Sequence, residues 1–407
     1  MPNNQGERPI ALSLASTLNR PLSIAMVAPC PFPTRQGTQV LIRHLASALA
    51  YCGHEVHLIT YGHGEYEDDF PFHLHRSAKV GGGLRSGPSV MKPAADAALA
   101  LTAARVIKAH GCDLLHVHNV EGLGIGAVLK LQTALPLVYH AHNAMGPELP
   151  TYFRTALAQT FASVVGEVID RTFPRAADAV IAFDQDHKAL HEVHGIPTER
   201  IHVIPPGLLG NELAEPCPEE LQRVSLHLGE GPWLLYAGNP DGYQNLSLLW
   251  KSFELIRAER PDVRLLVAAN CAEVAFEPEL RRLQDRSGVV VHRYRSLQEL
   301  RALFSLASVG LCPRALWTGV PIKLLNYMSV GLPVVASKAA GRYVVGDSCG
   351  ILVEPDPIAF AQATLKLLGA SCSPAKIQRR YRRFRLEGQV ESYESVYRDV
   401  LRRKQLN

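Results

Sequence analysis

The stretch "TGVPIKLLNYMSVGLPVVAS", residues 318–337, predicts a short helix followed by a buried strand. Pro321 suits the first helical turn, where a missing backbone N–H costs nothing, and Gly331 suits the helix end. The helix is therefore expected over residues 321–330, with an apolar run before it at 309–314. A strand-helix-strand unit of this kind is typical of a parallel sheet that is covered on both faces.

The same alternation continues on both sides of this unit, over residues 226–378. Short runs rich in Val, Ile and Leu are expected to be strands, and the longer periodic segments between them helices. The pattern predicts a doubly wound α/β domain. Its expected strands cover residues 233–239, 263–270, 288–294, 309–314 and 332–337, and its expected helices cover residues 245–259, 278–285, 297–307 and 321–330.

An earlier series of the same kind occupies residues 21–208 and predicts another doubly wound domain. Its expected strands cover residues 23–29, 54–60, 113–119, 135–143, 178–184 and 200–207. Residues 209–225 contain two prolines and several acids without a strand pattern, so we interpret them as a linker. Residues 1–20 are expected to form a loose N-terminal arm, and residues 379–407 a basic helical tail.

Length and composition support a soluble protein with more than one domain. A chain of 407 residues is long for one core, and 47% hydrophobic with 20% charged residues is ordinary for a globular protein. No apolar run reaches the ~18 residues of a membrane span, and the N-terminal stretch lacks the basic leader and cleavage site of a secretion signal. The net charge of +4 gives no argument for a nucleic-acid partner. The eight cysteines show no CxxC or metal-ligand spacing, which favours a reducing compartment and hence the cytoplasm.

Two segments are candidates for binding phosphate in the cleft that such domains form at their strand ends. In "APCPFPTRQGTQ" (28–39), Gly37 lies between a strand end and a helix start, where backbone N–H groups favour an anion. The alternative is a proline-rich loop with a turn glycine. In the helix over 321–330, Lys323 occupies the first turn, which disfavours a cation unless an anion is bound nearby. Lys323, Asn326 and Tyr327 share one helix face, although a surface lysine covering apolar neighbours is the simpler interpretation.

Two pairs of histidines end two of the expected strands, in "HVHN" (116–119) and "YHAHNAMGPELP" (139–150). Strand alternation places His116 with His118 on one face, and His140 with His142 on one face. A histidine at this edge can transfer a proton or donate a hydrogen bond to a substrate oxygen. For any one of the four, a hydrogen-bonded structural histidine is the simpler interpretation. A zinc site is a weaker alternative, because no carboxylate pattern accompanies the pairs, and we predict no metal site.

Two further patterns are interpreted as structural. "GLGIGA" (122–127) superficially offers a dinucleotide fingerprint, but its last glycine is one residue early and no acid follows at a strand end. We interpret it as a turn at a helix entry, which argues against a dehydrogenase. "EYEDDF" (65–70) offers a DxD-like metal motif for sugar nucleotides, but it lies in a polar loop, so a solvated acidic loop is the preferred interpretation.

Taken together, these stretches resemble the GT-B glycosyltransferases of the large retaining family 4 type, over about residues 21–400. "PFPTRQGTQVLIRHLASALAYCGHEVHLIT" is similar to the opening of that family, and "RIHVIPPG" to its interdomain signature. "KLLNYMSVGLPVVAS" is similar to the donor-site helix and the strand after it. "ESYESVYRDVLRR" resembles the closing helix that crosses back to the first domain. The resemblance implies a GT-B architecture, with two Rossmann-like domains facing a central cleft.

The resemblance also implies a reaction and a site. A sugar is transferred from a nucleotide-diphosphate donor, with UDP or GDP preferred, with retention of configuration and without a bound metal or other cofactor. The donor lies on the second domain and the acceptor mainly on the first, as in bacterial-type glycan or glycoconjugate biosynthesis. His142 matches the histidine near the transferred sugar and is the candidate catalytic residue. The candidate substrate-binding residues are Gly37, His118, Asn143, Asn239, Gln244, Arg314, Thr318, Gly319, Lys323, Leu324 and Asn326.

The sequence departs from the family at four charged positions. Thr318 and Asn326 replace two glutamates, and Asn239 and Gln244 stand where an arginine and a lysine are usual. An asparagine still accepts and donates hydrogen bonds, but the charge-assisted bonds are lost. The nearest basic residues that can replace the missing charge are Arg314, Lys323 and Arg342. Because the glycine turns and helix caps are intact, we interpret the site as reworked and not as dead.

Two other functions fit the same architecture. A non-catalytic GT-B protein that binds nucleotide or a partner transferase would explain the neutral positions, and a sugar-nucleotide epimerase would share the fold. The acceptor, whether a small molecule, a glycan or a lipid-linked sugar, is not specified. The basic stretch "KIQRRYRRFR" (376–385) would suit an anionic membrane surface and peripheral association, although a solvated basic helix is the simpler interpretation.

Overall fold

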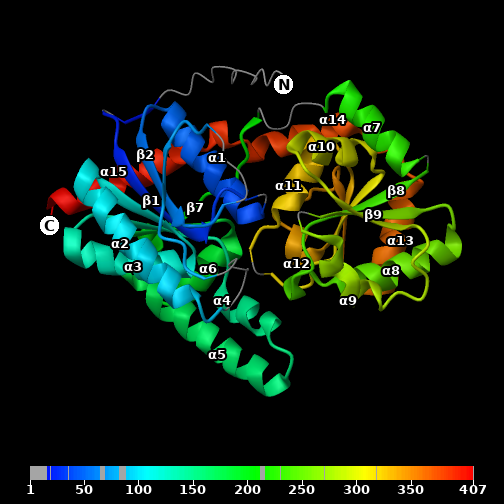
Figure 1. Ribbon diagram of the computed structural model, residues 1–407, viewed down its shortest axis with the longest axis horizontal. Helices are drawn as coiled ribbons and strands as arrows, with labels where there is room; N and C mark the ends of the chain where they lie inside the picture. The colour runs from blue at the N-terminus through cyan, green and yellow to red at the C-terminus, as the bar shows by residue number, and fades with distance from the viewer. Residues whose placement is uncertain are drawn as a thin grey trace.

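Two parallel sheets form two α/β lobes that lie side by side along the long axis of the molecule (Figure 1). This is a computed structural model, and it describes residues 16–18, 20–34, 36–64, 69–81, 89–210, 216–229, 231–269, 271–317 and 319–406. The predicted α/β class, with two doubly wound lobes, is confirmed. In each lobe the apolar runs are the strands, because a parallel sheet that is buried on both faces needs apolar side chains on both.

The first sheet has seven strands within the described residues, in the order β3-β2-β1-β4-β5-β6-β7. The paired strands run parallel, and the order changes direction between β1 and β4. A change of this kind opens a crevice at the carboxyl ends of the strands. The strands are β1 (Ser23–Pro31), β2 (Glu55–Tyr61), β3 (His73–Arg76), β4 (Leu114–His118), β5 (Leu137–Ala141), β6 (Ala179–Ala182) and β7 (Ile201–Val203).

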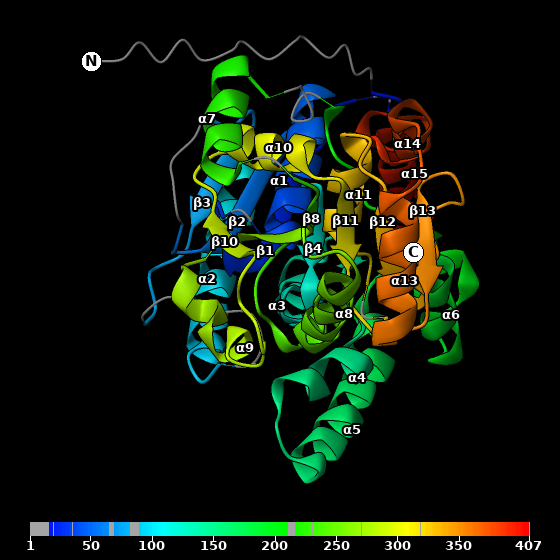
Figure 2. The same cartoon turned by 90° about the vertical axis from the view of Figure 1, so that its right-hand side faces the viewer.

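Helices cover both faces of this sheet, and each face has its own apolar core. The helices are α1 (Gly37–Tyr51), α2 (Lys92–His110), α3 (Asn119–Thr133), α4 (Met145–Glu148), α5 (Ala156–Thr172) and α6 (Gln185–Val193). Helix α1 packs with the core on one face, whereas α2 and α3 pack with the core on the other. Figures 1 and 2 both show α5 projecting beyond the body of the lobe.

The second sheet has six strands in the described part of the chain, in the order β10-β9-β8-β11-β12-β13. Its order changes direction between β8 and β11, so its own crevice opens there. The strands are β8 (Trp233–Ala237), β9 (Arg264–Ala269), β10 (Val289–Arg293), β11 (Val309–Cys312), β12 (Val334–Ser337) and β13 (Gly350–Val353).

The helices of the second lobe include one inside the segment that we interpreted as a linker. Helix α7 begins at Pro218 and packs against α10, so it belongs to this lobe. Residues 211–215 of the expected linker lie outside the described residues. The helices are α7 (Pro218–Leu228), α8 (Leu246–Glu259), α9 (Glu277–Leu280), α10 (Leu297–Leu306), α11 (Ile322–Ser329), α12 (Lys338–Gly341), α13 (Pro357–Leu368) and α14 (Pro374–Tyr381).

The chain then returns to the first lobe as helix α15 (Val390–Leu406), which runs behind the first sheet in Figure 1. Tyr393 and Tyr397 are buried in a core of the first lobe, and the Tyr397 hydroxyl lies 2.7 Å from Nδ1 of His116. Burying a large side chain stabilises by roughly 1.5–3 kcal/mol. The expected tail of residues 379–407 is thus divided, because α14 extends to Tyr381 and packs on α11 of the second lobe.

Three local features differ from the sequence interpretation. Strands β3 and β13 were not predicted, since each is a four-residue edge strand without a long apolar run. The "GLGIGA" segment lies inside α3 and is not a turn at its entry; a Cβ on Gly126 would approach Leu137 to 2.7 Å, so glycine allows close helix-sheet contact. Of the acidic stretch 65–70, residues 65–68 lie outside the described residues.

No helix in the described ranges combines the length and apolar character needed to cross a membrane.

Candidate active site

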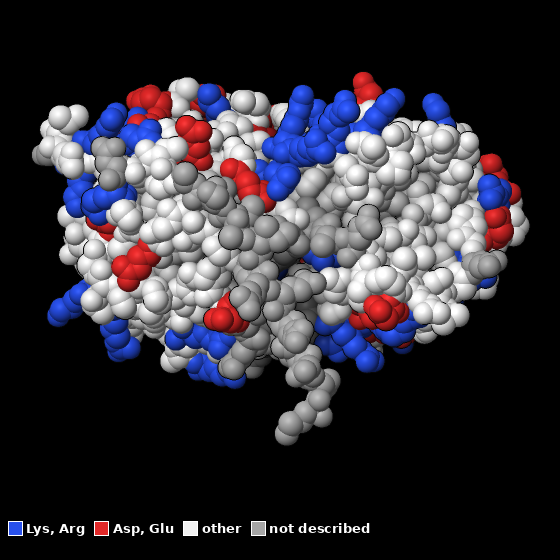
Figure 3. Space-filling model, turned by 90° about the horizontal axis from the view of Figure 1, so that it is seen from above, with Lys and Arg blue, Asp and Glu red and all other residues white. Residues whose placement is uncertain are grey.

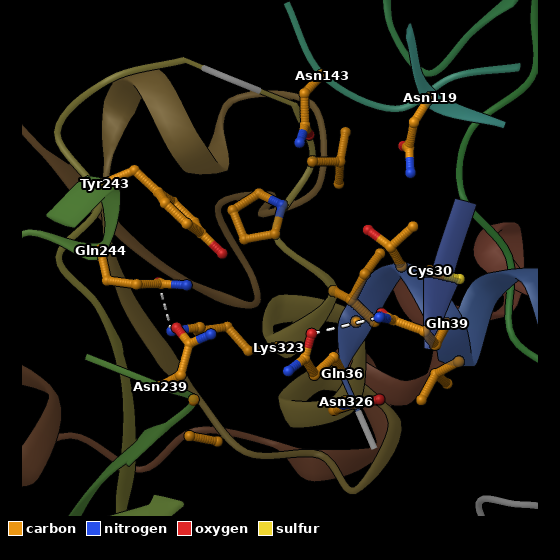
Figure 4. Close-up of a pocket in the computed structure, with 18 of the residues that line it drawn as sticks. Cys30, Gln36, Gln39, Asn119, Asn143, Asn239, Tyr243, Gln244, Lys323 and Asn326 are labelled. Atoms are coloured by element: carbon orange, nitrogen blue, oxygen red, sulfur yellow. Dashed lines mark hydrogen bonds between the residues drawn. The ribbon is translucent and has the colours of Figure 1, made fainter. Parts of the chain in front are cut away.

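A cavity of about 550 Å³ lies between the two lobes, at the carboxyl ends of the central strands of both sheets (Figure 4). Open α/β sheets bind ligands at this position. Segments that follow β1, β4 and β5 form the wall on the first lobe, and segments that follow β8 and β11 form the wall on the second. Polar side chains on the wall include Gln36, Gln39, Asn119, Asn143, Glu148, Asn239, Tyr243, Gln244, Arg314, Lys323 and Asn326.

The first turns of helices α1 and α11 lie next to each other at this cavity. A Cβ built on Gly37 would lie 3.4 Å from Cγ1 of Ile322, so the two helix starts are in contact range. Neither Gln36 before α1 nor Pro321 before α11 caps its helix with a side chain. Gly37 and Ile322, the first residues of the two helices, both line the cavity, so the positive helix ends lie at it, an arrangement that favours an anion.

Lys323 is the cation next to these helix starts. Its ammonium donates a hydrogen bond to Oε1 of Gln244 at 2.9 Å and lies 3.9 Å from the centre of the Tyr236 ring. Burial lowers the pKa of Lys323 to about 8. Its hydrogen-bond partner is an amide oxygen, and the nearby Asp241 carboxylate offsets the lowering of its pKa only in part, so the ammonium can still attract an anion.

Arg314 and Glu148 form a second charged feature, with one residue from each lobe. The Arg314 side chain is buried over the Tyr243 ring at 4.9 Å, and its Nε has no hydrogen-bond partner among the described residues. Glu148 accepts a hydrogen bond from the Tyr152 hydroxyl at 2.8 Å, while its other oxygen has no partner among the described residues. Burial raises the pKa of Glu148, and the nearby Arg314 opposes this rise. Buried polar atoms without partners that line a cavity are suited to bonding a polar ligand.

Three of the four neutral residues at the family's charged positions, Asn239, Gln244 and Asn326, lie on the second-lobe wall. Asn239 donates a hydrogen bond to Oδ2 of Asp241 at 2.7 Å, and Gln244 is occupied by Lys323. Asn326 follows Lys323 by one turn of α11 and lines the cavity. The structure thus brings Gly37, Asn143, Asn239, Gln244, Arg314, Lys323 and Asn326 together around one cavity, the first two on the first lobe and the others on the second.

His118 and His142 lie outside the lining of this cavity. Both imidazoles are buried, with Nδ1 of His118 2.9 Å from Nε2 of His142, and they line a separate space of about 10 Å³. Burial lowers the pKa of His142 to about 3, and burial also lowers the pKa of His118 strongly. Both side chains are therefore neutral near neutral pH. The catalytic role of His142 stays a prediction, and it would act from behind the wall that Asn143 forms.

The remaining predicted residues have different positions. Thr318 lies outside the described residues. Gly319 has a φ of +127°, and a side chain there would collide with the backbone oxygen of His142, so glycine lets this loop approach the first lobe. Leu324 is fully buried in the second-lobe core. Arg342 forms an ion pair with Asp186 of α6, a contact between the lobes, instead of lining the cavity.

Glu148 and Tyr243 are site residues that the sequence interpretation missed. Glu148 lies within the quoted 139–150 segment, but nothing in its local pattern shows that it faces the other lobe. The one sequence feature that could have marked Glu148 as a site residue is its place in the segment that follows a strand, where open sheets place functional side chains.

On the first-lobe wall, Lys92 and Glu121 form an ion pair at 2.7 Å and offer polar groups to a second ligand.

Sequence comparison gives a match for each lobe. Residues 35–208 match Glycosyltransferase Family 4, and residues 231–370 match Glycosyl transferases group 1. The chain belongs to the GT-B glycosyltransferases of the family 4 type. The predicted family is therefore confirmed, and the cavity lies between the two matched regions.

Relatives and solved structures are distant in sequence. The D-inositol 3-phosphate glycosyltransferase of Xylanimonas cellulosilytica is 25% identical over 272 residues, which cover 63% of this chain and 63% of that protein. The MMP alpha-(1->4)-mannosyltransferase of Mycolicibacterium hassiacum is 24% identical, over 84% of this chain and 88% of that protein. The sucrose-phosphate synthase from Thermosynechococcus elongatus has a TM-score of 0.76 at 18% identity, covering 93% of this chain and 99% of that one. Anabaena Alr3699/HepE in complex with UDP-glucose has a TM-score of 0.67 at 17% identity, covering 92% and 98%.

Proposed function

We propose that this protein transfers a sugar from a nucleoside-diphosphate donor to an acceptor held by the first lobe. The observation that carries the proposal is the cavity between the lobes, where two helix starts and a half-buried lysine converge. These groups favour a diphosphate, because backbone N–H groups, helix dipoles and an ammonium all attract negative charge. A bound diphosphate would in turn offset the cost of burying the Lys323 charge.

The leaving group of such a transfer is the nucleoside diphosphate, which gains negative charge as the glycosidic bond to it breaks. Lys323 and the helix N–H groups are positioned to stabilise that charge as it develops. Arg314, buried beside Tyr243, adds a further cation on the same wall. In this proposal these groups replace both the missing arginine-lysine pair and a divalent cation, so transfer continues in the presence of a chelator.

The donor base and the stereochemistry are the finer parts of the proposal. A UDP or GDP donor and retention of configuration are supported by family membership and by the solved HepE complex, whose ligand is UDP-glucose. Asn326 is placed one turn along α11 from Lys323, where an amide can hydrogen-bond a ribose hydroxyl. We propose that His142 positions its neighbour Asn143, which lines the cavity, beside the transferred sugar.

A thermal-shift screen with UDP, GDP, ADP and their glucose and mannose derivatives tests donor binding, because a ligand that binds only the native state raises its stability. The matched assay follows sugar transfer or donor hydrolysis in the purified protein. Binding with turnover supports the proposal, and binding without any turnover would favour a non-catalytic nucleotide-binding protein. A changed sugar in the absence of acceptor would instead identify an epimerase, and no shift with any nucleotide would overturn the proposal.

The acceptor class is open between small molecules, glycans and lipid-linked sugars. A membrane acceptor is favoured by exposed basic side chains on α14 and the turn after it, which Figure 3 shows gathered on this side of the molecule. These are Lys376, Arg379, Arg382, Arg383 and Arg385. Clustered cations of this kind attract anionic lipid surfaces at low salt. We propose peripheral contact through this patch, with a cytoplasmic location.

A further inference from the structure

A second group of histidines lies at the outer edge of the first lobe, away from the cavity between the lobes. It consists of His57 on β2, His75 on β3 and His110 at the end of α2. One ring nitrogen from each lies within 4.8 Å of those of the other two. Three residues from three different elements therefore converge on one point.

The strand pairing and the helix end explain this convergence. β2 and β3 are parallel neighbours with His57 opposite His73, and β3 is the edge strand of the sheet. Because side chains alternate along a strand, Glu55 shares the face of His57, and His75 shares the face of His73. Helix α2 stops at Gly111, which adopts the left-handed conformation, so its last residue His110 ends above the same face.

One distance in the group is close to that between neighbouring ligands of a metal ion. Nδ1 of His57 and Nε2 of His75 lie 3.1 Å apart and share a hydrogen bond, and two nitrogens bound at ~2.0–2.1 Å in a tetrahedral site are about 3.4 Å apart, so an ion could take the place of the shared proton. The ring centres of His57 and His110 are 4.1 Å apart. The other nitrogen of His57, Nε2, lies 3.1 Å from Oε1 of Glu55, although the two are not aligned for a hydrogen bond. A metal-bound imidazole commonly directs its second nitrogen to a carboxylate in this way.

The group is open to solvent on one side. The His57 side chain is fully buried, whereas those of His110 and Glu55 are 37% and 48% exposed, so an ion can enter from solvent.

We propose that His57, His75 and His110 bind a divalent transition-metal ion of the zinc type, with water completing the coordination. A set of imidazole donors favours zinc, nickel or copper over magnesium or calcium, which prefer oxygen. The ion would fasten the edge strand β3 and the end of α2 to β2. It would stabilise the first lobe and protect an exposed sheet edge.

This metal site is separate from the proposed transfer site. Tyr61, the last residue of β2, lines the cavity between the lobes, and His57 precedes it by four strand residues, or about 13 Å. The ion would therefore not contact the donor. The proposal stands or falls independently of the glycosyltransferase function, because its readouts are metal binding and stability.

The chain contains another close group, His116, His118 and His140, which is a competing location for an ion. All three side chains are fully or almost fully buried, and the Tyr397 hydroxyl also bonds to His116. That group has no exposed member through which an ion can enter. We therefore assign the metal to the edge group, and the experiment separates the two.

The experiment uses tag-free, full-length protein treated with chelator and then dialysed. Isothermal titration with zinc chloride compares the wild-type protein, the double variant His75→Ala/His110→Ala, and the control His227→Ala, an exposed histidine of α7 in the other lobe. Circular dichroism confirms that the metal-free variants fold. We expect one zinc ion per chain for the wild type and the control, and an affinity at least 100-fold weaker for the double variant, as losing a ligand costs more than losing its outer partner.

X-ray absorption of the zinc-loaded wild type gives a second test, with an expected nitrogen or oxygen shell at about 2.0–2.1 Å. Zinc should also raise the unfolding temperature of the wild type and the control, but not of the double variant. Undiminished zinc affinity in the double variant would overturn the proposal and move the ion to the buried group. A sulfur shell at about 2.3 Å would overturn it in favour of cysteine ligands. Absence of zinc binding to the wild type would also overturn it.

Discussion

Replacing Lys323 by methionine should separate two effects of its charge: the cost to the stability of the folded protein and the contribution to nucleotide binding. Burial is the main cause that lowers its pKa from 10.5 to about 8. At ~1.4 kcal/mol per pKa unit, keeping this lysine charged costs the folded protein roughly 3 kcal/mol near neutral pH. Methionine keeps an unbranched apolar stem of similar length beside Tyr236. We therefore expect Lys323→Met to unfold at a temperature a few degrees higher than the wild type at about pH 7.

The pH dependence of stability follows from the same shift. The folded-state pKa lies below the unfolded value, so between about pH 8 and pH 10.5 the unfolded chain holds more protons than the folded one. Stability from this group therefore rises with pH across that window, and below it the full cost is present. Lys323→Met should lose this rise. Lys338→Met, which changes an exposed lysine of α12, is the matched control and should keep it.

Nucleotide binding should respond in the opposite direction. A unit charge pair at ~4 Å is worth at most about 4 kcal/mol at an effective dielectric constant of 20, and hydration reduces this gain. We expect Lys323→Met to bind UDP or GDP roughly 10- to 100-fold more weakly in isothermal titration. At about pH 8 the wild type should also take up protons on binding, because the anion raises the lysine pKa. Unchanged affinity together with no proton uptake would refute the reasoning.

Four further predictions concern the same cavity and the basic tail. Gln244→Glu gives Lys323 a carboxylate partner, so titration should show at least tenfold weaker nucleotide binding, with an unfolding temperature that rises and does not fall. Glu148→Gln should cut turnover by about 100-fold while donor affinity stays near wild type, since Glu148 comes from the opposite lobe; equal loss of binding would contradict this. His142→Ala should lower turnover strongly in protein that still binds nucleotide. It should also lower the unfolding temperature, because the substitution removes the buried contact with His118. Turnover equal to that of the wild type would exclude His142 from the mechanism. Charge reversal on α14 and the turn after it, by Arg379→Glu, Arg382→Glu and Arg383→Glu, should abolish sedimentation with anionic vesicles at low salt and leave transfer to a soluble acceptor intact. Sedimentation equal to that of the wild type would exclude this patch.

Much of the fold could be predicted because parallel sheets have a strong sequence signal. Runs such as 23–29 and 233–239 are buried on both faces, so they read as continuous apolar stretches between helical patterns. The edge strands β3 and β13 were missed because an edge strand is short and partly solvated, and two of the four residues of β3 are histidines. The glycines of 122–127 were misplaced because close helix-sheet packing, which is a tertiary contact, is what requires them.

The candidate site could be predicted only where function follows from local structure. The starts of α1 and α11, with Gly37 and Lys323, were predicted because helix boundaries are signalled by proline, glycine and apolar period. The presence of Glu148 and Arg314 at the same cavity was not predicted, because the two residues come from different lobes and lie near each other only when the cavity forms. His142 was predicted correctly as a strand-end residue, yet its ring points into the buried histidine group, and strand alternation alone does not reveal which face is covered by α15.

The sequence by itself determined two doubly wound lobes, their approximate limits and the helix start that faces the cleft, because apolar period and helix-ending residues are local properties of the chain. The tertiary structure alone decided which charges share the cavity, which histidines are buried and which lie at the sheet edge. Those outcomes depend on contacts such as Gly37 with Ile322, and His57 with His110, between residues far apart in the chain. Desolvation and ligand geometry are set by such contacts, and no local pattern encodes them.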